Sequence, residues 1–393
     1  MIPGFVAQPL RLQRRDSRDA IFMPSGAYLC QGDSHRVSRL QESTICTIWA
    51  GAKHGDCPRR HRRQPLLFHL KAALICLLWV TTLPASSIDW IEDLGGTVTR
   101  DASGEVTGVD LRATWVTDTD LRKLAQFAKL THLDLSLTRI TDQGMQELKG
   151  LPGIVELNLR FAEYVTDEGL AAVKEWKNLK RLNVRGTKIS DTTLDHISGV
   201  ATIESVDVGS SLVTDVGLER LSALPNLKEL TMGGNELGDA GLQALRLLPG
   251  LTYLDLKGRQ GTDSNVWTVS ISDRGLEALL TLKELRELRF GCTTLGVGRE
   301  GTRFATVNVT SVTSRWLEKM KALTKLERLK LQGCDRVDDE AMNVLAGFPS
   351  LKEVDLKGSG VTQKGIAVLR AARPNVRIYS GPWEATSAAF RNN

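Results

Sequence analysis

The sequence predicts an α/β solenoid in which each unit adds one strand and one short helix. Three observations support this: a repeat of about 24 residues, apolar alternation at the start of each unit, and a helix-start signal after it. A single unit cannot bury its own leucines, so neighbouring units must stack into a continuous core. We predict eleven strand cores, beginning at Val106, Leu130, Ile154, Leu179, Ile203, Leu227, Leu251, Leu285, Leu326, Leu351 and Val376.

Residues 130–153, "LTHLDLSLTRITDQGMQELKGLPG", illustrate one unit. Leu133 and Leu135 alternate with polar residues, which is typical of a half-buried strand. Thr141 and Asp142 form a helix-start signal, and the aspartate lies near the positive end of the helix dipole. Every third residue from Met145 to Leu151 is apolar, so one helical face is predicted to join the core.

The first 87 residues differ from the rest of the chain in charge. They hold twelve Lys or Arg against five Asp or Glu, whereas the remainder carries a slight excess of acids. No basic stripe after residue 87 favours nucleic acid. Residues 59–87 combine a basic start, an apolar run and a small-residue end, which predicts a signal peptide, or a membrane anchor if the leader stays uncleaved. We therefore expect a secreted, periplasmic or cell-envelope protein. Residues 1–58 are unassigned, and the true start is predicted downstream of Met1.

The remaining organisation follows from the repeat. Residues 88–105 are predicted to cap the solenoid of residues 106–380, and residues 381–393 form a tail. Two insertions, 259–270 and 293–311, enter consecutive units between strand and helix, so both are expected on one rim. Their alternating residues predict short β-segments that pair with each other. Trp316, in a position usually held by glycine, is expected to pack against Trp267.

The sequence offers no constellation typical of an enzyme. Only His132 and His196 follow the leader, and they are predicted far apart, so no metal site is expected. No motif for a nucleophile or a phosphate-binding loop is found, and no cofactor is predicted. Cys292 and Cys334 follow adjacent strands, and we consider either a disulfide or buried small side chains.

The open face of the sheet is the candidate binding surface, because alternation assigns its residues. The middle column is predicted to contain Asp110, Asp134, Asn158, Asn183, Asp207, Thr231, Asp255, Arg289, Lys330 and Asp355. Arg160 and Arg185 lie in the next column, and Gly209 and Gly233 make part of it shallow. The full set of candidate binding residues is Arg160, Arg185, Asp207, Tyr253, Asp255, Lys257, Trp267, Arg289, Arg303, Phe304, Trp316 and Lys330. The alternative is a solvated face on which neighbouring acids and bases screen one another.

The repeated "TD-x-G-L-x-x-L" pattern, as at residues 166–173 and 214–221, resembles leucine-rich repeats of the ribonuclease-inhibitor-like and F-box-associated branches. The segment "IEDLGGTVTRDASGEVTGVDLRATWVTDTDL" is similar to the start of exported bacterial leucine-rich repeat proteins. The resemblance implies a curved solenoid with a parallel sheet on the concave face and helices on the convex face. It also implies non-enzymatic binding of a protein or an envelope polymer, with membrane contact only through an uncleaved leader.

Two other interpretations stay open. One is an intracellular, substrate-recruiting adaptor of a ubiquitin-ligase type, although this chain has the leader where such an adaptor would carry an F-box. The other is a structural envelope protein without a specific ligand.

Overall fold

A computed structural model describes residues 88–261, 266–291 and 312–382. The predicted α/β solenoid is confirmed: within these ranges one twelve-stranded sheet runs through all units, with strand order following the sequence. Strand β1 (Thr97–Arg100) is antiparallel to β2. The parallel strands are β2 (Val106–Asp110), β3 (His132–Asp134), β4 (Glu156–Asn158), β5 (Arg181–Asn183), β6 (Ser205–Asp207), β7 (Glu229–Thr231), β8 (Tyr253–Asp255), β11 (Glu287–Arg289), β12 (Arg328–Lys330), β13 (Glu353–Asp355) and β14 (Arg377–Tyr379).

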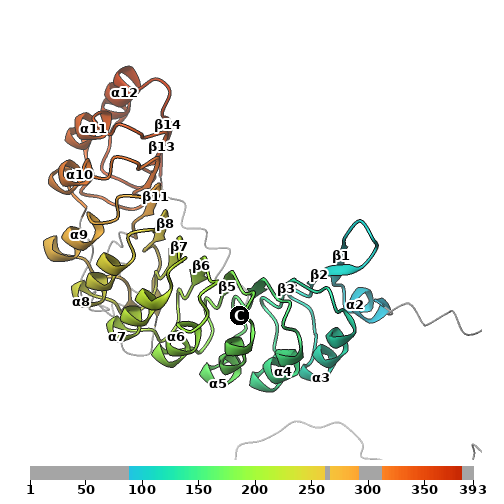
Figure 1. Ribbon diagram of the computed structural model, residues 1–393. Coiled ribbons are helices and arrows are strands. Elements are labelled where there is room, and N and C mark those ends of the chain that lie inside the picture. The colour runs from blue at the N-terminus through green and yellow to red at the C-terminus, as the bar shows by residue number, and fades with distance from the viewer. Residues whose placement is uncertain (1–87, 262–265, 292–311, 383–393) are drawn as a thin grey trace, which may run out of the picture. The chain divides into compact units, whose positions relative to one another are not determined.

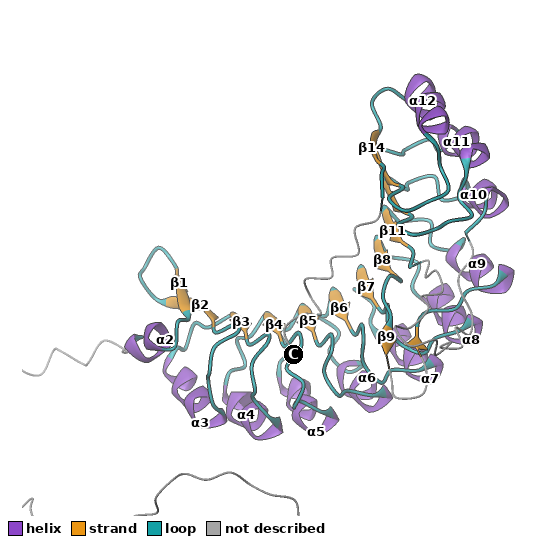
Figure 2. Cartoon of the chain, turned by 180° about the vertical axis from the view of Figure 1, so that it is seen from behind, coloured by secondary structure: helices purple, strands orange, loops and turns teal. Residues whose placement is uncertain are grey.

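The helices lie opposite the strands. The strands line the inner side of the curved array, and the helices line its outer side (Figure 1, Figure 2). The α-helices are α2 (Asp89–Asp93), α3 (Asp118–Leu121), α4 (Asp142–Glu147), α5 (Asp167–Leu170), α6 (Asp191–Ile197), α7 (Asp215–Leu218), α8 (Asp239–Leu242), α9 (Asp273–Leu279), α10 (Ser314–Met320), α11 (Asp339–Ala346) and α12 (Gln363–Ala372). Several continue as 3-10 turns: η1 (Arg122–Gln126), η2 (Leu148–Gly150), η3 (Ala171–Glu175), η4 (Glu219–Ala223) and η5 (Gln243–Leu247). None of the described helices is long and apolar enough to cross a bilayer.

The strands are shorter than the predicted strand cores, but their register is as predicted. Leu133 pairs with Val109 on one side and Leu157 on the other, and Asp134 lies between Asp110 and Asn158. The predicted strand start at Leu130 is wrong by two residues, because the amide of Leu130 bonds to the carbonyl of Phe127 in a turn. The apolar columns are buried throughout and form one core that runs the length of the array.

The repeated Thr-Asp-x-Gly segment forms a hydrogen-bond ladder between consecutive helices. Thr166 donates its backbone N–H (2.7 Å) and its hydroxyl (2.6 Å) to the carboxylate of Asp142 in the preceding unit. The same hydroxyl accepts the N–H of Glu168 and caps its own helix. A Cβ on Gly169 would collide with the Asp142 carboxylate, so the glycine makes room for the ladder. Equivalent pairs join Thr141 to Asp118, Ser190 to Asp167, Thr214 to Asp191, Ser272 to Asp239 and Thr362 to Asp339.

Trp316 occupies the glycine position of its unit and bonds to the aspartate of the preceding unit through its own side chain. Its indole N–H donates to Asp273 of the preceding unit at 2.7 Å, and the side chain is 7% exposed. The structure gives Trp316 this carboxylate partner, and the expected packing against Trp267 stays a prediction.

The first insertion contains short β-segments, as its alternation predicts, and they form a small hairpin. Strands β9 (Gln260–Gly261) and β10 (Val266–Trp267) pair antiparallel, and Val269 then bridges in parallel to Leu237 of the preceding unit. Strands β9 and β10 therefore pair within the insertion, while Val269 joins the insertion to the preceding unit. The second insertion, including Arg303 and Phe304, lies outside the described residues, so the expected pairing of the two insertions stays a prediction.

Candidate functional site

The polar middle column of the concave face has a structural role that sequence reasoning missed. Its Asp and Asn side chains accept the backbone N–H two residues further on, as in Asp134 with Ser136 (2.8 Å) and Asp255 with Lys257 (2.7 Å). The same bond recurs at Asp110, Asn158, Asn183, Asp207 and Asp355. These side chains satisfy the backbone where each strand ends. Strand termination is therefore sufficient to explain why Asp and Asn recur in this column.

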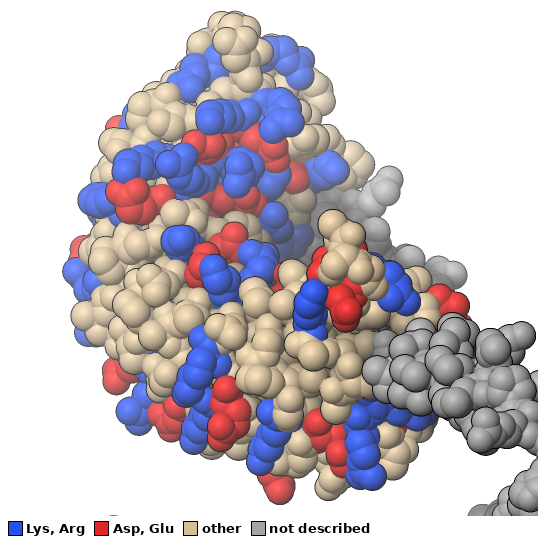
Figure 3. All heavy atoms as spheres, turned by 45° about the vertical axis from the view of Figure 1, so that its right-hand side comes forward, with Lys and Arg blue, Asp and Glu red and all other residues tan. Residues whose placement is uncertain are grey.

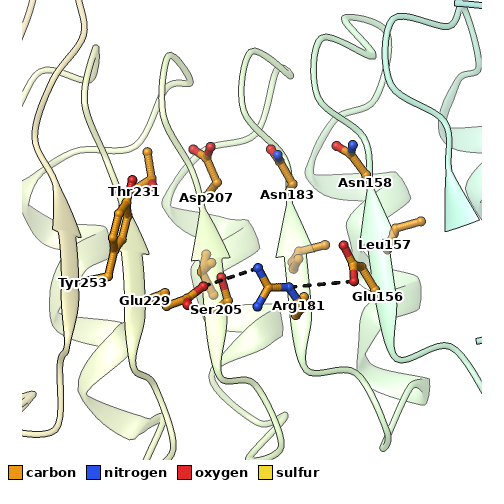
Figure 4. Close-up of a pocket in the computed structure, with 12 residues that line it drawn as sticks. Glu156, Leu157, Asn158, Arg181, Asn183, Ser205, Asp207, Glu229, Thr231 and Tyr253 are labelled. Carbon is orange, nitrogen blue, oxygen red and sulfur yellow. Dashed lines mark ion pairs between the residues drawn. The ribbon is translucent and has the colours of Figure 1, made fainter. Parts of the chain in front are cut away.

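A hollow of about 300 Å³ opens in the middle of the concave face, across strands β4 to β8. Its polar lining comes from one residue row that contains Glu156, Arg181, Ser205, Glu229 and Tyr253, and from the middle column beside it (Figure 4). The sheet forms the floor of the hollow and leaves its polar groups open to the concave side. The site is therefore shaped by side chains of five consecutive units.

Arg181 crosses this hollow and is held loosely. Its guanidinium lies 3.8 Å from the Glu156 carboxylate on β4 and 3.4 Å from Glu229 on β7 (Figure 4). It reaches past β6 because the residue there, Ser205, is small. All three charged side chains are between 42% and 52% exposed, so these ion pairs contribute little stability. Arg181 and both of its partners therefore stay accessible to solvent.

Asp207, a candidate from the sequence, lines the same hollow beside Arg185. Its Oδ1 accepts the N–H of Gly209 at 2.9 Å, and the Arg185 guanidinium lies 3.7 Å away. Burial raises the pKa of the Asp207 carboxyl, and Arg185 opposes this only in part. A Cβ at Gly209 would lie 2.9 Å from the backbone oxygen of Gly233 and would also displace the Arg185 guanidinium. The predicted shallow stretch is thus filled by Arg185.

Replacement of Asp207 by asparagine is expected to stabilise the protein at neutral pH. The raised pKa means that folding disfavours the charged carboxylate. The charged carboxylate therefore lowers the free energy of unfolding at pH values above the folded pKa. This loss of stability disappears as the pH falls towards 3.8, the ordinary pKa of an aspartate. Asparagine keeps the acceptor for Gly209, as Asn183 does for Arg185 on the next strand. Urea unfolding at a series of pH values measures the difference between D207N and the wild type.

Asp339 serves as the opposite control, because hydrogen bonds from Thr362 lower the pKa of its carboxyl. Its stabilising effect is present above the unfolded pKa and is lost as the pH falls through the folded pKa. Asp339→Asn is therefore expected to lose stability at neutral pH. Destabilisation of both variants to the same extent at neutral pH would contradict the assignment of Asp207.

The C-terminal part of the face brings together three predicted residues, Tyr253, Asp255 and Arg289. The Tyr253 hydroxyl donates to Asp255 at 3.3 Å, and the Arg289 guanidinium lies over the tyrosine ring at 5.2 Å and 3.6 Å from Asp255. Burial raises the pKa of both the Asp255 carboxyl and the Tyr253 hydroxyl. Arg289 also pairs with Glu287 at 2.7 Å. This cluster is internally satisfied, which fits the screened-face alternative better than an open binding site.

Lys257 and Lys330 also have partners within the face. Lys257 reaches Gln332 two strands away, and burial lowers its pKa. Lys330 pairs with Glu353 and lies 5.3 Å from the Tyr379 ring. Basic and acidic side chains are interleaved on the face shown in Figure 3. Of the charged candidates, Arg185 pairs with Asp207 and Arg289 with Asp255, while Lys257 and Lys330 have other partners on the face.

Three predicted residues lie elsewhere. Arg160 is exposed at the edge of the face and its guanidinium lies 5.0 Å from the Phe161 ring. Trp267 is on the β10 hairpin, and Trp316 is in the ladder of the helices. Cys334 is buried and disulfide-bonded, while Cys292 lies outside the described residues. In the described ranges no group of three or more His, Cys, Asp or Glu residues could hold a metal ion.

Comparison with protein families identifies the repeat. A family model described as "Leucine Rich repeat" matches residues 128–149 and 223–245, each spanning one strand and the helix after it. The fold is a leucine-rich repeat solenoid. A search of curated protein sequences finds no significant match.

Solved structures match this chain at low identity. An internalin (inlF) from Listeria monocytogenes is 20% identical with a TM-score of 0.45, and the match covers 66% of this chain and 69% of that one. Internalin C2 from the same organism is 22% identical, with a TM-score of 0.37 and coverage of 52% and 83%. The Arabidopsis receptor kinase HAESA, solved with the peptide hormone IDA and the co-receptor SERK1, is 19% identical with a TM-score of 0.44. That match covers 72% of this leucine-rich repeat chain but only 42% of the HAESA chain.

Sequence reasoning missed the residues that make the hollow, above all Glu156, Arg181 and Glu229. Alternation places them on the open face, two residues before the middle column, but Tyr253 was the one residue of this row chosen as a candidate. The available signal was the series Glu156, Arg181, Ser205, Glu229 in consecutive units, in which a small residue separates an arginine from a glutamate.

Proposed function

We propose that this chain is an exported bacterial leucine-rich repeat protein of the ribonuclease-inhibitor-like branch, which binds a protein partner on its concave face without catalysis. Solenoids of this kind present extended concave surfaces to their ligands. The observation that carries the proposal is the hollow of about 300 Å³ around Arg181. Here, within the described part of the face, three charged side chains are both exposed and loosely paired.

The charge of the hollow specifies what it accepts. Three carboxyls, from Glu156, Asp207 and Glu229, face one guanidinium, that of Arg181, and Asp207 also has Arg185 nearby. The excess of carboxylates favours a cationic group, and opposite charge across an interface fixes register and partner choice. A lysine or arginine side chain of the partner would replace Arg181 between the two glutamates. The proposed ligand is therefore a basic segment of a polypeptide.

Site-specific photo-crosslinking tests this proposal. A photoreactive amino acid at Ser205, on the floor of the hollow, is compared with one at Ser222, in η4 on the outer side. Peptide adducts rich in Lys or Arg from Ser205 alone are the expected result. Adducts from Ser222 alone, or saccharide adducts from Ser205, would refute it, and the latter would favour an envelope polymer. Absence of adducts from both positions would favour the structural envelope protein.

The compartment is part of the same proposal. Residues 59–87 have the sequence of an export signal, and Cys334 is disulfide-bonded, which is typical of oxidising compartments. We propose Cys292 as its partner. Peptide mapping without reduction is expected to recover the Cys292–Cys334 pair, and N-terminal sequencing is expected to find a mature end near Ile88. A mature end before Arg59 together with two free thiols would contradict export and would favour the intracellular adaptor.

A further inference from the structure

A second surface lies on the rim where the strands end, apart from the concave hollow. In each unit a buried valine or isoleucine lies shortly before the helix. The residue immediately before it is large and exposed in five consecutive units. In order these residues are Trp115, Arg139, Tyr164, Lys188 and Leu212. Trp115 is 75% exposed, Tyr164 50% and Leu212 43%, among the most exposed large apolar side chains of the described part. We call these five residues the rim row.

Aromatic rings and cations alternate along the rim row and contact each other. The Arg139 guanidinium lies 5.3 Å from the Trp115 ring centre, and the Lys188 ammonium lies 5.7 Å from that of Tyr164. Arg160, beside the row, lies over Phe161 at 5.0 Å. Within the described residues none of these three cations has a carboxylate within ion-pair distance, in contrast to the charged cluster on the concave face. The rim row therefore carries uncompensated positive charge on an aromatic support.

The backbone fixes the spacing of the rim row. Tyr164, Lys188 and Leu212 each form a parallel bridge to the preceding unit, and the amides of Lys188 and Leu212 donate to carbonyls of Val165 and Ile189 at 3.0 and 2.9 Å. Consecutive members thus follow the strand spacing of about 4.8 Å. Because stacking on the rings already restricts the Arg139 and Lys188 side chains, these side chains would lose less conformational entropy when a ligand binds.

We propose that the rim row binds an acidic polypeptide segment that carries aromatic or aliphatic side chains. Its carboxylates would meet Arg139, Arg160 and Lys188, and its apolar side chains would cover Trp115 and Tyr164. Trp, Tyr and Arg are the residues that dominate binding energy at protein interfaces. Two exposed acids lie nearby. Glu163 is next to Tyr164, and Glu236 occupies the position of the rim row in the unit after Leu212, where the row ends. Cations therefore outnumber acids on this surface.

The proposal does not depend on the concave hollow, which has the opposite charge. The probe that tests it is a soluble copolymer of glutamate and tyrosine, titrated against the full chain by isothermal calorimetry at low and physiological salt. The double variant R139A/K188A is expected to weaken binding at least about tenfold, and W115A/Y164A by a similar factor. Higher salt is expected to weaken binding by the wild type more than binding by R139A/K188A.

Matched controls keep the test specific. Arg220→Ala removes an exposed, paired arginine on the outer side, and Leu247→Ala removes a leucine that is 61% exposed there; both should bind the copolymer as the wild type does. E156Q/E229Q should also leave copolymer binding unchanged, which separates this surface from the hollow. Equal binding by R139A/K188A and the wild type would overturn the proposal. Binding of polygalacturonate without binding of the copolymer would overturn the choice of a polypeptide.

Discussion

Replacement of Gly241 by alanine is expected to destabilise the solenoid by about 2 kcal/mol. Gly241 lies at the glycine position of the ladder, where a Cβ would lie 2.9 Å from the Cα of Asp215 and would collide with its carboxylate. That carboxylate accepts the N–H of Gly238 at 2.8 Å, so moving it breaks the bond between units. Because each unit is held only by its neighbours, the loss should spread to the whole transition. Urea unfolding followed by circular dichroism measures it.

Two comparisons separate the ladder from general effects of losing glycine. Gly150→Ala has open space around the new Cβ and is expected to be neutral or slightly stabilising. At position 241 threonine should be tolerated better than valine of the same shape, by about 1 kcal/mol. Thr193 is the precedent, because it occupies this position in its unit and donates its hydroxyl to Asp167. Equal losses for G241T and G241V would show that space alone matters, and not the carboxylate.

Removal of the two glutamates that flank Arg181 is expected to weaken binding of poly-L-lysine to the concave face about tenfold. Glu156 and Glu229 would each form a solvent-exposed ion pair with a lysine of the polymer. Two such pairs together account for roughly a tenfold change in affinity. Arg181→Ala is expected to act in the opposite direction and to tighten binding, because it removes the internal competitor for the same carboxylates. Calorimetric titration of wild type, E156Q/E229Q and R181A gives both signs in one series.

Glu219→Gln supplies the matched control, because Glu219 is an exposed glutamate in η4 on the outer side. Its affinity for poly-L-lysine should equal that of the wild type. Weaker binding by R181A, or an equal loss in E219Q and E156Q/E229Q, would mean that the lysine polymer senses only overall charge. The hollow would then have no selective role.

The fold was largely predictable because each unit repeats the same physical problem. Alternation at Leu133 and Leu135, repeated in every unit, determines which side of each strand is buried and thereby aligns Asp134 with its neighbours in adjacent strands. The Thr-Asp-x-Gly spacing likewise predicted where α4, α5 and α7 begin. What the spacing could not reveal is that the aspartate bonds to the threonine of the next unit, because that requires the distance between stacked units.

The site was less predictable, because its side chains reach across more than one strand. Arg181 contacts β7 only because Ser205 is small, and Lys257 reaches Gln332 across a strand that has Gly291 at the intervening position. Such contacts depend on the length and rotamer of a side chain, which alternation does not encode. The rim row escaped the sequence interpretation for a related reason. Trp115 and Tyr164 precede the helices in irregular segments, where no periodic pattern assigns a face.

The central claim is that the concave sheet is the ligand-binding face. Hydroxyl-radical footprinting of the full chain, alone and with the partner recovered from cells, tests it most directly. Tyr253 lines the hollow and Leu247 lies on the outer side, so the two report on opposite faces. The account predicts that the partner slows oxidation of Tyr253 and leaves that of Leu247 unchanged. Protection of Leu247 with unchanged oxidation of Tyr253 would contradict it.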